Sequence, residues 1–339
     1  MTPHASMKAA VLHEYGAPFQ LNSVARPVPA AGQVLVRIVA SGVNPLDLKI
    51  RAGAAAHARH PLPAILGIDL AGVVEAVGAD VSAFRRGDEV YGMTGGVGGV
   101  QGSLAEFAAV DAALLAHKPA HLSMREAAAL PLIFITAWEG LVDRARLRAG
   151  QTLLVQGGGG GVGHVAIQIG RAFGADVFAT ASADHADLLL RLGATPIDYR
   201  ATSVEDMVAR HSGGRGFDVV YDTAGGSSLD ASFNAVARFG HVVSSLGWGT
   251  HALAPLSFRA ATYSGVFTLL PLLTGAGKAH HGDILREATR LAEAGQLMPR
   301  LDPRHFNLAA LDDADAALEN KQADGKLVID MAEWSPAQS

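Results

Sequence analysis

Hydrophobic and polar positions follow two different patterns along the chain, and the change comes near Ser123. Before that point, short apolar runs are separated by Gly, Pro and Asp, and few stretches show a helical period. The runs are Val34–Val39, Gly72–Val77, Glu89–Tyr91 and Leu104–Val110. This pattern predicts a β-rich, largely antiparallel module in the first third of the chain.

After Ser123, continuous apolar runs alternate with helical stretches. The runs are Thr152–Gln156, Asp176–Thr180, Thr195–Asp198, Asp218–Asp222, His241–Ser245 and Ser264–Leu269. Strands that are apolar on both faces are typical of parallel sheets covered by helices. The pattern therefore predicts an α/β fold with a doubly wound parallel sheet of six strands. Beyond Leu270 we expect two helices, His281–Ala294 and Leu311–Lys321, and a final strand, Lys326–Met331.

Composition narrows the classes of function. The 339 residues include 27 Lys and Arg and 32 Asp and Glu, a net charge of −5. A general nucleic-acid-binding protein is usually basic, so we expect no nucleic-acid partner. No cysteine is present, which excludes disulfides, thiolate-bound zinc and a cysteine nucleophile. Glycine occurs 39 times, and much of it is clustered, as in loops where the backbone approaches a ligand closely.

No targeting segment is evident at the N-terminus, which lacks the basic and then apolar order of a secretory signal. The longest apolar stretch, near Ala127–Trp138, has about 12 residues, well short of the roughly 20 that a membrane span needs. We therefore expect a soluble cytoplasmic protein with no membrane partner.

A glycine loop follows the apolar run Thr152–Gln156 and precedes a predicted helix, Val162–Gly174. Gly158, Gly160 and Gly163 match the pattern G-x-G-x-x-G, and Gly161 and Val162 complete the turn. Small residues are needed where the chain turns tightly, touches a pyrophosphate and packs a helix on a strand. The helix N-terminus offers N–H groups to phosphates. The loop therefore predicts a dinucleotide site rather than a flexible linker.

The second run of this unit ends before Ser182, which lies 19 residues after Gly163. An acid about 20 residues past the fingerprint would bind the ribose hydroxyl of NAD, whereas a hydroxyl group can donate to the 2′-phosphate of NADPH. His185 and Arg200 can add positive charge there, so NADPH is the predicted cofactor. The alternative is that Asp184 is the acid, in a shifted register.

Five further stretches carry a resemblance to a known family. They are VASGVNPLD (39–47), LGIDLAGVV (66–74), RGDEVYG (86–92), GSLAE (102–106) and LPLIFITAW (130–138). With the glycine loop, they make the chain similar to the medium-chain dehydrogenase/reductase superfamily over nearly its whole length. The resemblance implies a GroES-like β-rich catalytic domain at residues 1–127 and 270–339 and a Rossmann NADPH-binding domain at residues 128–269.

Zinc alcohol dehydrogenases of this superfamily carry Cys, His and Cys at three ligand positions. The matching positions here hold Asn44, Ile68 and Leu132, which are not zinc ligands, and the four-cysteine structural lobe is missing. The resemblance therefore points to the zinc-independent branch of NADPH quinone oxidoreductases and alkenal or enone reductases, with no metal. Bacterial quinone reductases often have Tyr where Lys49 stands, and stretches 44–49 and 130–140 look more like the alkenal reductases. Asp69, in place of the usual Glu, is predicted to be structural.

Conjugate reduction suits a site without a metal. A hydride goes to the β-carbon of an enone or to a quinone ring, and the charge that builds on the carbonyl oxygen needs only hydrogen-bond donors. Asn44 and Lys49 are the candidate catalytic donors. The alternatives are that Lys49 is a solvated surface lysine and that Asn44 only shapes a turn.

The resemblance also places Thr136 and the backbone of Phe267 to Leu269 at the nicotinamide end of the cofactor. The alternative for Thr136 is a helix-interior threonine bonded to its own backbone. His57 and His60 are predicted surface residues in a loop.

Three more cofactor candidates follow strands at their carboxyl ends, where open α/β sheets bind ligands: Ala224, Leu246 and Gly247. Tyr199 is a candidate for the adenosine end or, equally, for the core. Trp248 lines the substrate pocket or simply packs.

Two functions remain open. The first is an NADPH-dependent reductase of quinones or α,β-unsaturated carbonyls, and the second is a catalytically weak NADPH-binding protein of the crystallin-like or regulatory kind. We also expect a homodimer, because Ser264–Leu269 is predicted to be an apolar edge strand. In the alternative, the helix His281–Ala294 covers that edge and the protein is a monomer.

Overall fold

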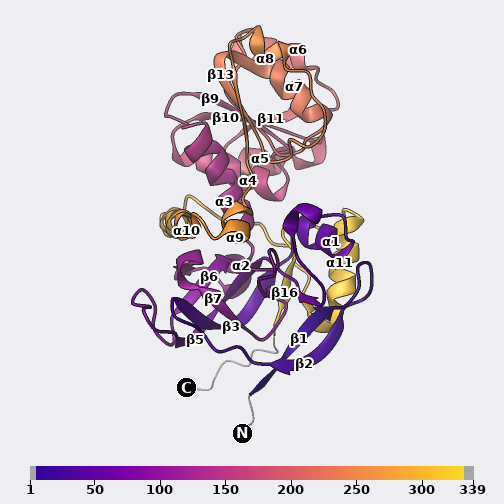
Figure 1. Cartoon of the computed structure of the whole chain (residues 1–339). Helices are drawn as coiled ribbons and strands as arrows, with labels where there is room; N and C mark the ends of the chain where they lie inside the picture. The colour runs from indigo at the N-terminus through magenta and orange to yellow at the C-terminus, as the bar shows by residue number, and fades with distance from the viewer. Residues whose placement is uncertain (1–4, 332–339) are drawn as a thin grey trace. The chain divides into compact units, whose positions relative to one another are not determined.

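The computed structural model describes residues 5–331, which form two compact units. The first unit contains the described residues up to 132, residues 269–293 and the described residues from 299 on. The second unit contains residues 133–268 and 294–298. Each is described separately below, and Figure 1 labels their elements.

The first unit is rich in β-structure, as the sequence predicts. Its strands are β1 (Ser6–Leu12), β2 (Gln20–Ala25), β3 (Gln33–Gly42), β4 (Ala64–Ile65), β5 (Asp69–Val77), β6 (Glu89–Met93), β7 (Phe107–Asp111), β8 (Leu115–His117), β15 (Phe306–Asn307) and β16 (Val328–Asp330). Its helices are α1 (Pro45–Arg51), α2 (Met124–Ala128), α9 (Leu270–Thr274), α10 (Lys278–Glu293) and α11 (Leu311–Glu319). Helix α3 (Pro131–Trp138) starts in this unit and continues into the second.

Two sheets make up the first unit. One has the order β2-β1-β4, and the other has the order β15-β16-β3-β5-β6-β8, with β7 also paired to β3. All these pairings are antiparallel except that of β15 with β16. Strand β3 is mostly buried, and its backbone is paired with β5 on one side and with β7 and β16 on the other.

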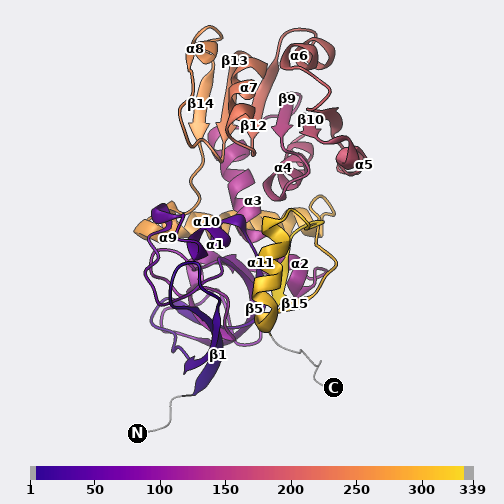
Figure 2. The ribbon, with the colours of Figure 1, turned by 90° about the vertical axis from the view of Figure 1, so that its right-hand side faces the viewer.

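Two helices of the first unit are tied together by charge. Arg51, in the last turn of α1, donates at 2.6 Å to Asp312 and at 2.6 Å to Asp315 of α11. Helices α1 and α11 lie side by side in both Figure 1 and Figure 2. This contact joins an early segment of the chain to one of its last.

The second unit contains a parallel sheet of six strands, which confirms the predicted fold class. The strands are β9 (Thr152–Gln156), β10 (Asp176–Ala181), β11 (Thr195–Asp198), β12 (Phe217–Asp222), β13 (Val236–Ser244) and β14 (Thr262–Gly265), in the order β11-β10-β9-β12-β13-β14. The helices are α4 (Gly161–Ala172), α5 (Ala186–Arg191), α6 (Val204–Ser212), α7 (Ser227–Ala235) and α8 (Ala254–Ser257). The order reverses between β9 and β12, and ligands bind at such a switch point.

Apolar packing holds the helices on this sheet. Helix α4 packs on β9 and β10, and α7 packs on β12 and β13. One core cluster is built from strand and helix residues that are almost fully buried, among them Leu154, Phe217 and Phe233. Among residues 5–331, no helix is long and apolar enough to cross a membrane.

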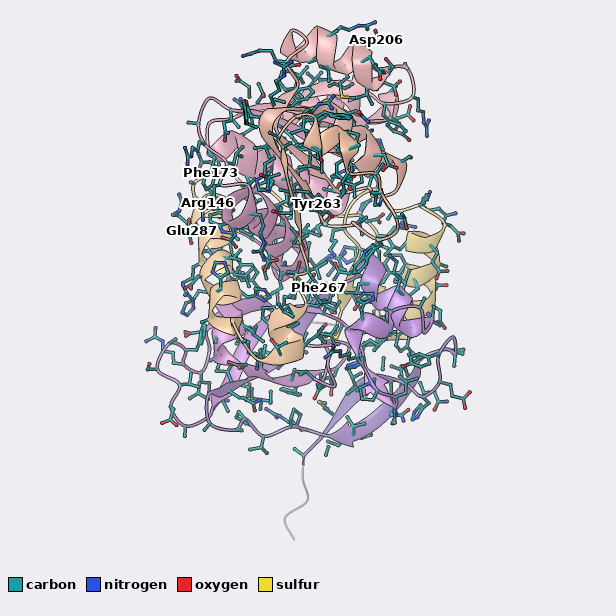
Figure 3. All side chains as sticks on the ribbon, turned by 45° about the horizontal axis from the view of Figure 1, so that its top comes forward. Arg146, Phe173, Asp206, Tyr263, Phe267 and Glu287 are labelled. Carbon is teal, nitrogen blue, oxygen red and sulfur yellow. The ribbon has the colours of Figure 1, made fainter. Side chains whose placement is uncertain are left out.

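Two predictions about single segments are wrong. The last strand of the sheet is Thr262–Gly265 rather than Ser264–Leu269, because the chain leaves the sheet after Val266, whose N–H donates to Ser244 O at 2.9 Å. Figure 3 labels Tyr263 on this strand and Phe267 farther along the same segment. His60 is buried rather than exposed, and its Nδ1 accepts a hydrogen bond from Gly99 N at 3.1 Å.

Candidate cofactor site and buried polar cluster

The glycine loop of the second unit is as compact as its sequence predicts. Gly157 has a φ of +78°, which favours glycine, and turns the chain out of β9. A Cβ on Gly158 would lie 2.8 Å from Ala179 Cβ, and a Cβ on Gly163 would overlap the carbonyl oxygen of Gly157. These two glycines are therefore required by packing alone.

Gly160 and Gly161 are different, because both are exposed and neither has a severe Cβ overlap. His164 N donates to Gly160 O at 3.0 Å, so the N–H groups of residues 161–163 precede the regular helical bonds. They lie at the positive end of α4, which is a ready site for phosphate. The loop fits the pyrophosphate of a dinucleotide.

A row of polar side chains crosses the carboxyl ends of four neighbouring strands, and the sequence analysis missed it. Its members are Thr180, Gln156, Asp222 and Ser244; Gln156 pairs in register with Asp222, and Asp222 pairs with Ser244. Thr180 Oγ1 donates to Gln156 Oε1 at 2.7 Å and accepts from Gly157 N at 3.1 Å. The sequence could have predicted this row, because each of these apolar strands has a polar residue at or next to its carboxyl end.

Asp222 organises the loops that contain three of the predicted cofactor residues. Its carboxylate accepts from Gly225 N at 3.1 Å and from Ser244 Oγ at 2.7 Å. Ala224 N donates to it at 3.3 Å, and Leu246 N donates to Ser244 Oγ at 3.0 Å. The loop carrying Ala224 and the loop carrying Leu246, which Gly247 follows, are thus held together at the switch-point edge.

At the end of β10, Ser182 and His185 are brought together. Ser182 Oγ and His185 Nδ1 are hydrogen-bonded at 3.1 Å. Tyr199 is exposed rather than in the core, and Arg200 Nε donates to its hydroxyl oxygen at 3.3 Å. Asp184 is also exposed, on the short turn between Ser182 and α5.

Thr136 is buried in α3, and its hydroxyl lies 3.0 Å from that of Thr268. The carbonyl oxygen of Thr136 accepts from Tyr221 OH at 2.8 Å, so the helix is anchored to β12. Phe267 meets Trp248 edge-on, with ring centroids 6.3 Å apart. Leu269 belongs to the first unit, where it is buried at the start of α9.

In the first unit, Asn44 lies in a buried polar cluster with Asp69 and Lys326, and this name is kept below for these three residues. Asn44 is 0% exposed, and its Nδ2 donates to Asp69 Oδ2 at 3.0 Å. Lys326 is 7% exposed, and its ammonium donates to Asn44 Oδ1 and, at 2.7 Å, to Val43 O. Lys326 Nζ lies 3.8 Å from Asp69 Oδ2. The sequence analysis missed Lys326. A lysine at the start of a buried strand is unusual and could have indicated a buried polar partner.

The three predicted ligand positions of a zinc enzyme gather at this cluster. Asp69 Oδ1 accepts from Leu132 N at 2.9 Å, Asp69 Oδ2 accepts from Asn44, and Ile68 precedes Asp69 directly. The side chains at these positions are an amide and two hydrocarbons, which do not suit zinc. Within the described part of the chain, no group of three or more His, Cys, Asp or Glu side chains could hold a metal ion.

Burial shifts the titration of the cluster and of Asp47 beside it. Burial raises the pKa of Asp69 to about 6, and the charge of Lys326 opposes the shift. Burial raises the pKa of Asp47 to about 7, and the charge of Asp69 adds to this effect. The pKa of Lys326 is lowered, again by burial first. Asp47 Oδ2 accepts from Asn44 N at 2.9 Å and so caps α1.

Lys49 lies on the exposed side of α1. The helix begins at Pro45, directly after Asn44, so the buried polar cluster fixes its start. The structure thus places one predicted catalytic residue in the interior and the other in solvent.

A parallel six-stranded sheet with a glycine loop after its first strand, together with a β-rich unit, is an arrangement typical of dinucleotide-binding oxidoreductases. Residues 30–120 match the alcohol dehydrogenase GroES-like domain family, and residues 192–329 match the zinc-binding dehydrogenase family. The chain belongs to the medium-chain dehydrogenase/reductase superfamily, and it is an oxidoreductase.

Individual relatives support this assignment. The chain is 38% identical over 336 residues to 2-methylene-furan-3-one reductase of Solanum lycopersicum, covering 96% of this chain and 79% of the relative. It is 36% identical over 334 residues to the chloroplastic NADPH-dependent alkenal/one oxidoreductase of Arabidopsis thaliana, covering 95% and 79%. A solved alcohol dehydrogenase superfamily protein from Novosphingobium aromaticivorans has a TM-score of 0.94 and 62% identity, covering 96% of this chain and 100% of that chain.

Proposed function

We propose that this protein is an NADPH-dependent reductase of α,β-unsaturated carbonyls or quinones that works without zinc. The observation that carries the proposal is the buried polar cluster at the positions where zinc enzymes hold their metal. Alcohol oxidation needs a Lewis acid or a base to stabilise the alkoxide, and Asn44, Ile68 and Leu132 supply no ligand for one. One relative is named a 2-methylene-furan-3-one reductase and another an NADPH-dependent alkenal/one oxidoreductase, which supports the substrate class and the cofactor.

NADPH, when bound, supplies a hydride for the β-carbon of an enone or for a quinone ring. The N–H groups at residues 161–163 hold the pyrophosphate, and Ser182 and His185 hold the 2′-phosphate. Lys49 donates a hydrogen bond to the carbonyl oxygen as negative charge builds on it. Asn44 is a positioning residue, because its buried amide fixes the start of the helix that carries Lys49.

A screen of NADPH oxidation with quinones, alkenals and cyclic enones tests the reaction. We expect turnover with at least one of these classes and no loss of activity after chelation. If the protein binds NADPH but turns over none of these substrates, the result would favour the alternative function, a catalytically weak NADPH-binding protein. About one zinc per chain in elemental analysis, with activity lost on chelation, would overturn the metal-free mechanism.

The cofactor is tested separately by isothermal titration. We expect NADPH to bind at least tenfold tighter than NADH, about 1.4 kcal/mol, because Ser182 can donate to a phosphate that a carboxylate would repel. Ser182→Asp is expected to shift the preference toward NADH. Equal or tighter binding of NADH to the wild-type protein would contradict the assignment.

We also propose that the protein is a homodimer that pairs through the edge strand β14. The strand ends the sheet next to β13, so one row of its backbone groups has no neighbour among the described strands. A proline at Val266, directly after this strand, would not test the edge, because the Val266 N–H donates to Ser244 O within the chain. Light scattering tests whether the protein is a dimer. We expect about twice the 35.0 kDa of one chain, and a mass of 35.0 kDa at micromolar concentrations would mean a monomer.

A further inference from the structure

Tyr221 is a buried tyrosine of the second unit that the proposed mechanism does not use. It is 0% exposed and directly precedes Asp222, the last residue of β12. Its hydroxyl donates at 2.8 Å to the carbonyl oxygen of Thr136 in α3. A buried tyrosine hydroxyl usually has such a partner, and the bond ties one turn of a helix to a strand. The Thr136 turn is therefore held beside the carboxyl end of β12.

The helix changes its form where the tyrosine ring meets it. Helix α3 ends at Trp138, and residues 139–144 continue as a π-helix. A Cβ on Gly140 would lie 2.8 Å from Tyr221 Cζ and 3.0 Å from its hydroxyl oxygen. The ring thus fills the space that a side chain at position 140 would need. Short π-helical segments inside longer helices are frequent at functional sites.

The Thr136 turn also contacts the segment that leaves the sheet after β14. The hydroxyls of Thr136 and Thr268 lie 3.0 Å apart. Two residues before Thr268, the Val266 N–H donates to the carbonyl oxygen of Ser244, the last residue of β13. The two threonines therefore lie near the carboxyl-end edge of the sheet, on the side of β12, β13 and β14.

This side of the sheet is the one left for the nicotinamide half of the cofactor. A dinucleotide binds across the switch point of a doubly wound sheet, with one half on each side. The glycine loop and Ser182 follow β9 and β10, and they take the pyrophosphate and the adenosine half in the site proposed above. The other half then reaches the carboxyl ends of β12 and β13, where the Thr136 turn lies.

We propose that Tyr221 is a positioning residue for the nicotinamide end of NADPH, because its hydroxyl holds the Thr136 turn that this end of the cofactor contacts. The proposal rests on the NADPH site proposed above. Without the hydroxyl, the turn loses a bond that fixes it, so binding of the nicotinamide half has to order the turn first. The adenosine half lies across the switch point and does not depend on this bond.

Isothermal titration of the full chain with two probes, NADPH and 2′,5′-ADP, separates the two halves of the site. The second probe carries the adenosine and the 2′-phosphate but no nicotinamide. Tyr221→Phe keeps the buried ring and removes only the hydroxyl oxygen. We expect its affinity for NADPH to fall about three- to tenfold, because the turn is no longer preorganised. Its affinity for 2′,5′-ADP is expected to stay within about twofold of the wild-type value.

Two more variants identify the contact responsible. Gly140→Ala forces the Tyr221 ring away from its place and is expected to show the same pattern with a larger loss of NADPH affinity. Tyr91→Phe is the matched control, because Tyr91 is also 0% exposed and its hydroxyl donates at 2.7 Å to a helix carbonyl, that of Leu285 in the first unit. We expect both affinities to be unchanged in this control. Circular dichroism of each variant verifies the fold.

The fluorescence of bound NADPH gives an independent readout, because it comes from the reduced nicotinamide ring. At saturating NADPH, we expect the emission of Tyr221→Phe to differ from that of the wild-type protein and the emission of Tyr91→Phe to match it. A general loss of stability would not change the emission of the saturated, folded protein.

The outcomes separate this proposal from the proposed function. Equal losses of affinity for the two probes in Tyr221→Phe would mean that the tyrosine stabilises the unit as a whole, and would overturn its positioning role. Unchanged affinity for both probes would also overturn that role, while leaving NADPH as the cofactor. A wild-type protein that binds neither probe would contradict the proposed cofactor and, with it, the role of Tyr221. If Tyr221→Phe does not fold, the same comparison in Gly140→Ala decides.

Discussion

The glycine loop of the second unit and the buried polar cluster of the first unit are assembled in opposite ways. The loop is one uninterrupted stretch, residues 157–163, between a strand and a helix. The cluster joins Asn44 to Asp69 across 25 positions and Asn44 to Lys326 across 282. The loop needs small residues and free backbone, whereas the cluster needs three particular side chains that satisfy one another.

The difference affects how each region responds to change. In the loop, a methyl group added at Gly163 would overlap the backbone carbonyl of Gly157, whereas one added at Gly161 would make only an ordinary contact. In the cluster, removing one member leaves a charge or an amide buried without its partner, which is costly. We therefore expect the largest effects on folding from the cluster and the most specific effects on cofactor binding from the loop.

The largest effect is expected from Lys326→Met. It leaves Asp69 buried without its cation, and breaking such a pair typically costs about 3–5 kcal/mol of unfolding free energy. Denaturant titration measures the loss, with the exposed Lys321→Met as the control. Adding Asp69→Asn to Lys326→Met removes both charges but keeps an oxygen that can accept from Leu132 N, and this double variant is expected to regain part of the stability. A loss below 1 kcal/mol in the single variant would show that the cluster does not stabilise the first unit.

The next effect concerns Asp47 and pH. Its folded-state pKa of about 7 lies above the ordinary 3.8, so the folded state keeps its proton while the unfolded state releases it. Stability is therefore lost as pH rises from about 4 to about 7, by about 1.4 kcal/mol for each pKa unit of the shift. Asp47→Asn cannot titrate, and we expect its stability relative to the wild-type protein to improve over this range. A difference that stays constant with pH would contradict the raised pKa.

A smaller effect, on rate, is expected from Lys49→Ala. Loss of a donor to a developing oxyanion typically lowers kcat by about 10²–10³, or roughly 2.7–4 kcal/mol. NADPH affinity and unfolding free energy are expected to stay unchanged, because Lys49 is exposed. Steady-state kinetics decides the matter, and an unchanged kcat would make Lys49 an ordinary surface lysine.

The smallest effect separates two glycines of the loop. Gly163→Ala forces backbone to move and is expected to cost about 1–3 kcal/mol of stability as well as NADPH affinity. Gly161→Ala has only an ordinary contact at 3.4 Å from Ile133, so stability is expected to stay within about 0.5 kcal/mol while affinity falls. Denaturant titration and isothermal titration with NADPH, carried out on both variants, measure the two effects separately. Equal stability of the two variants would mean that the loop relaxes around Gly163.

The contrast also explains what the sequence predicts well. The glycine loop, the six strands and their alternation with helices follow from local patterns, and the structure confirms them. The last strand was misplaced because Val266, Phe267 and Leu269 are as apolar as a strand but pack outside it. His60 was misplaced because its hydrogen-bond partner, Gly99, lies 39 positions away in the sequence.

The cluster was predictable only in part. Asn44 was singled out because of its position in a motif, and Asp69 was expected to be structural, which fits its three buried contacts. Lys326 was passed over as the first residue of a strand. Its partner Asn44 lies 282 positions earlier in the sequence, and no local hydrophobic period or motif spacing can predict a contact between such distant residues.

The pairing of β16 with β3 has a consequence for synthesis of the chain. Val328 and Asp330 face Gly42 and Ala40 across that ladder, so the first unit lacks a strand and the ammonium of Lys326 until residue 330 has been synthesised. The six strands of the second unit are complete by residue 265. Because domains generally fold as units, the nucleotide-binding sheet can form during translation while the earlier segment waits for its last partner. The half of the molecule that begins first is thus finished last.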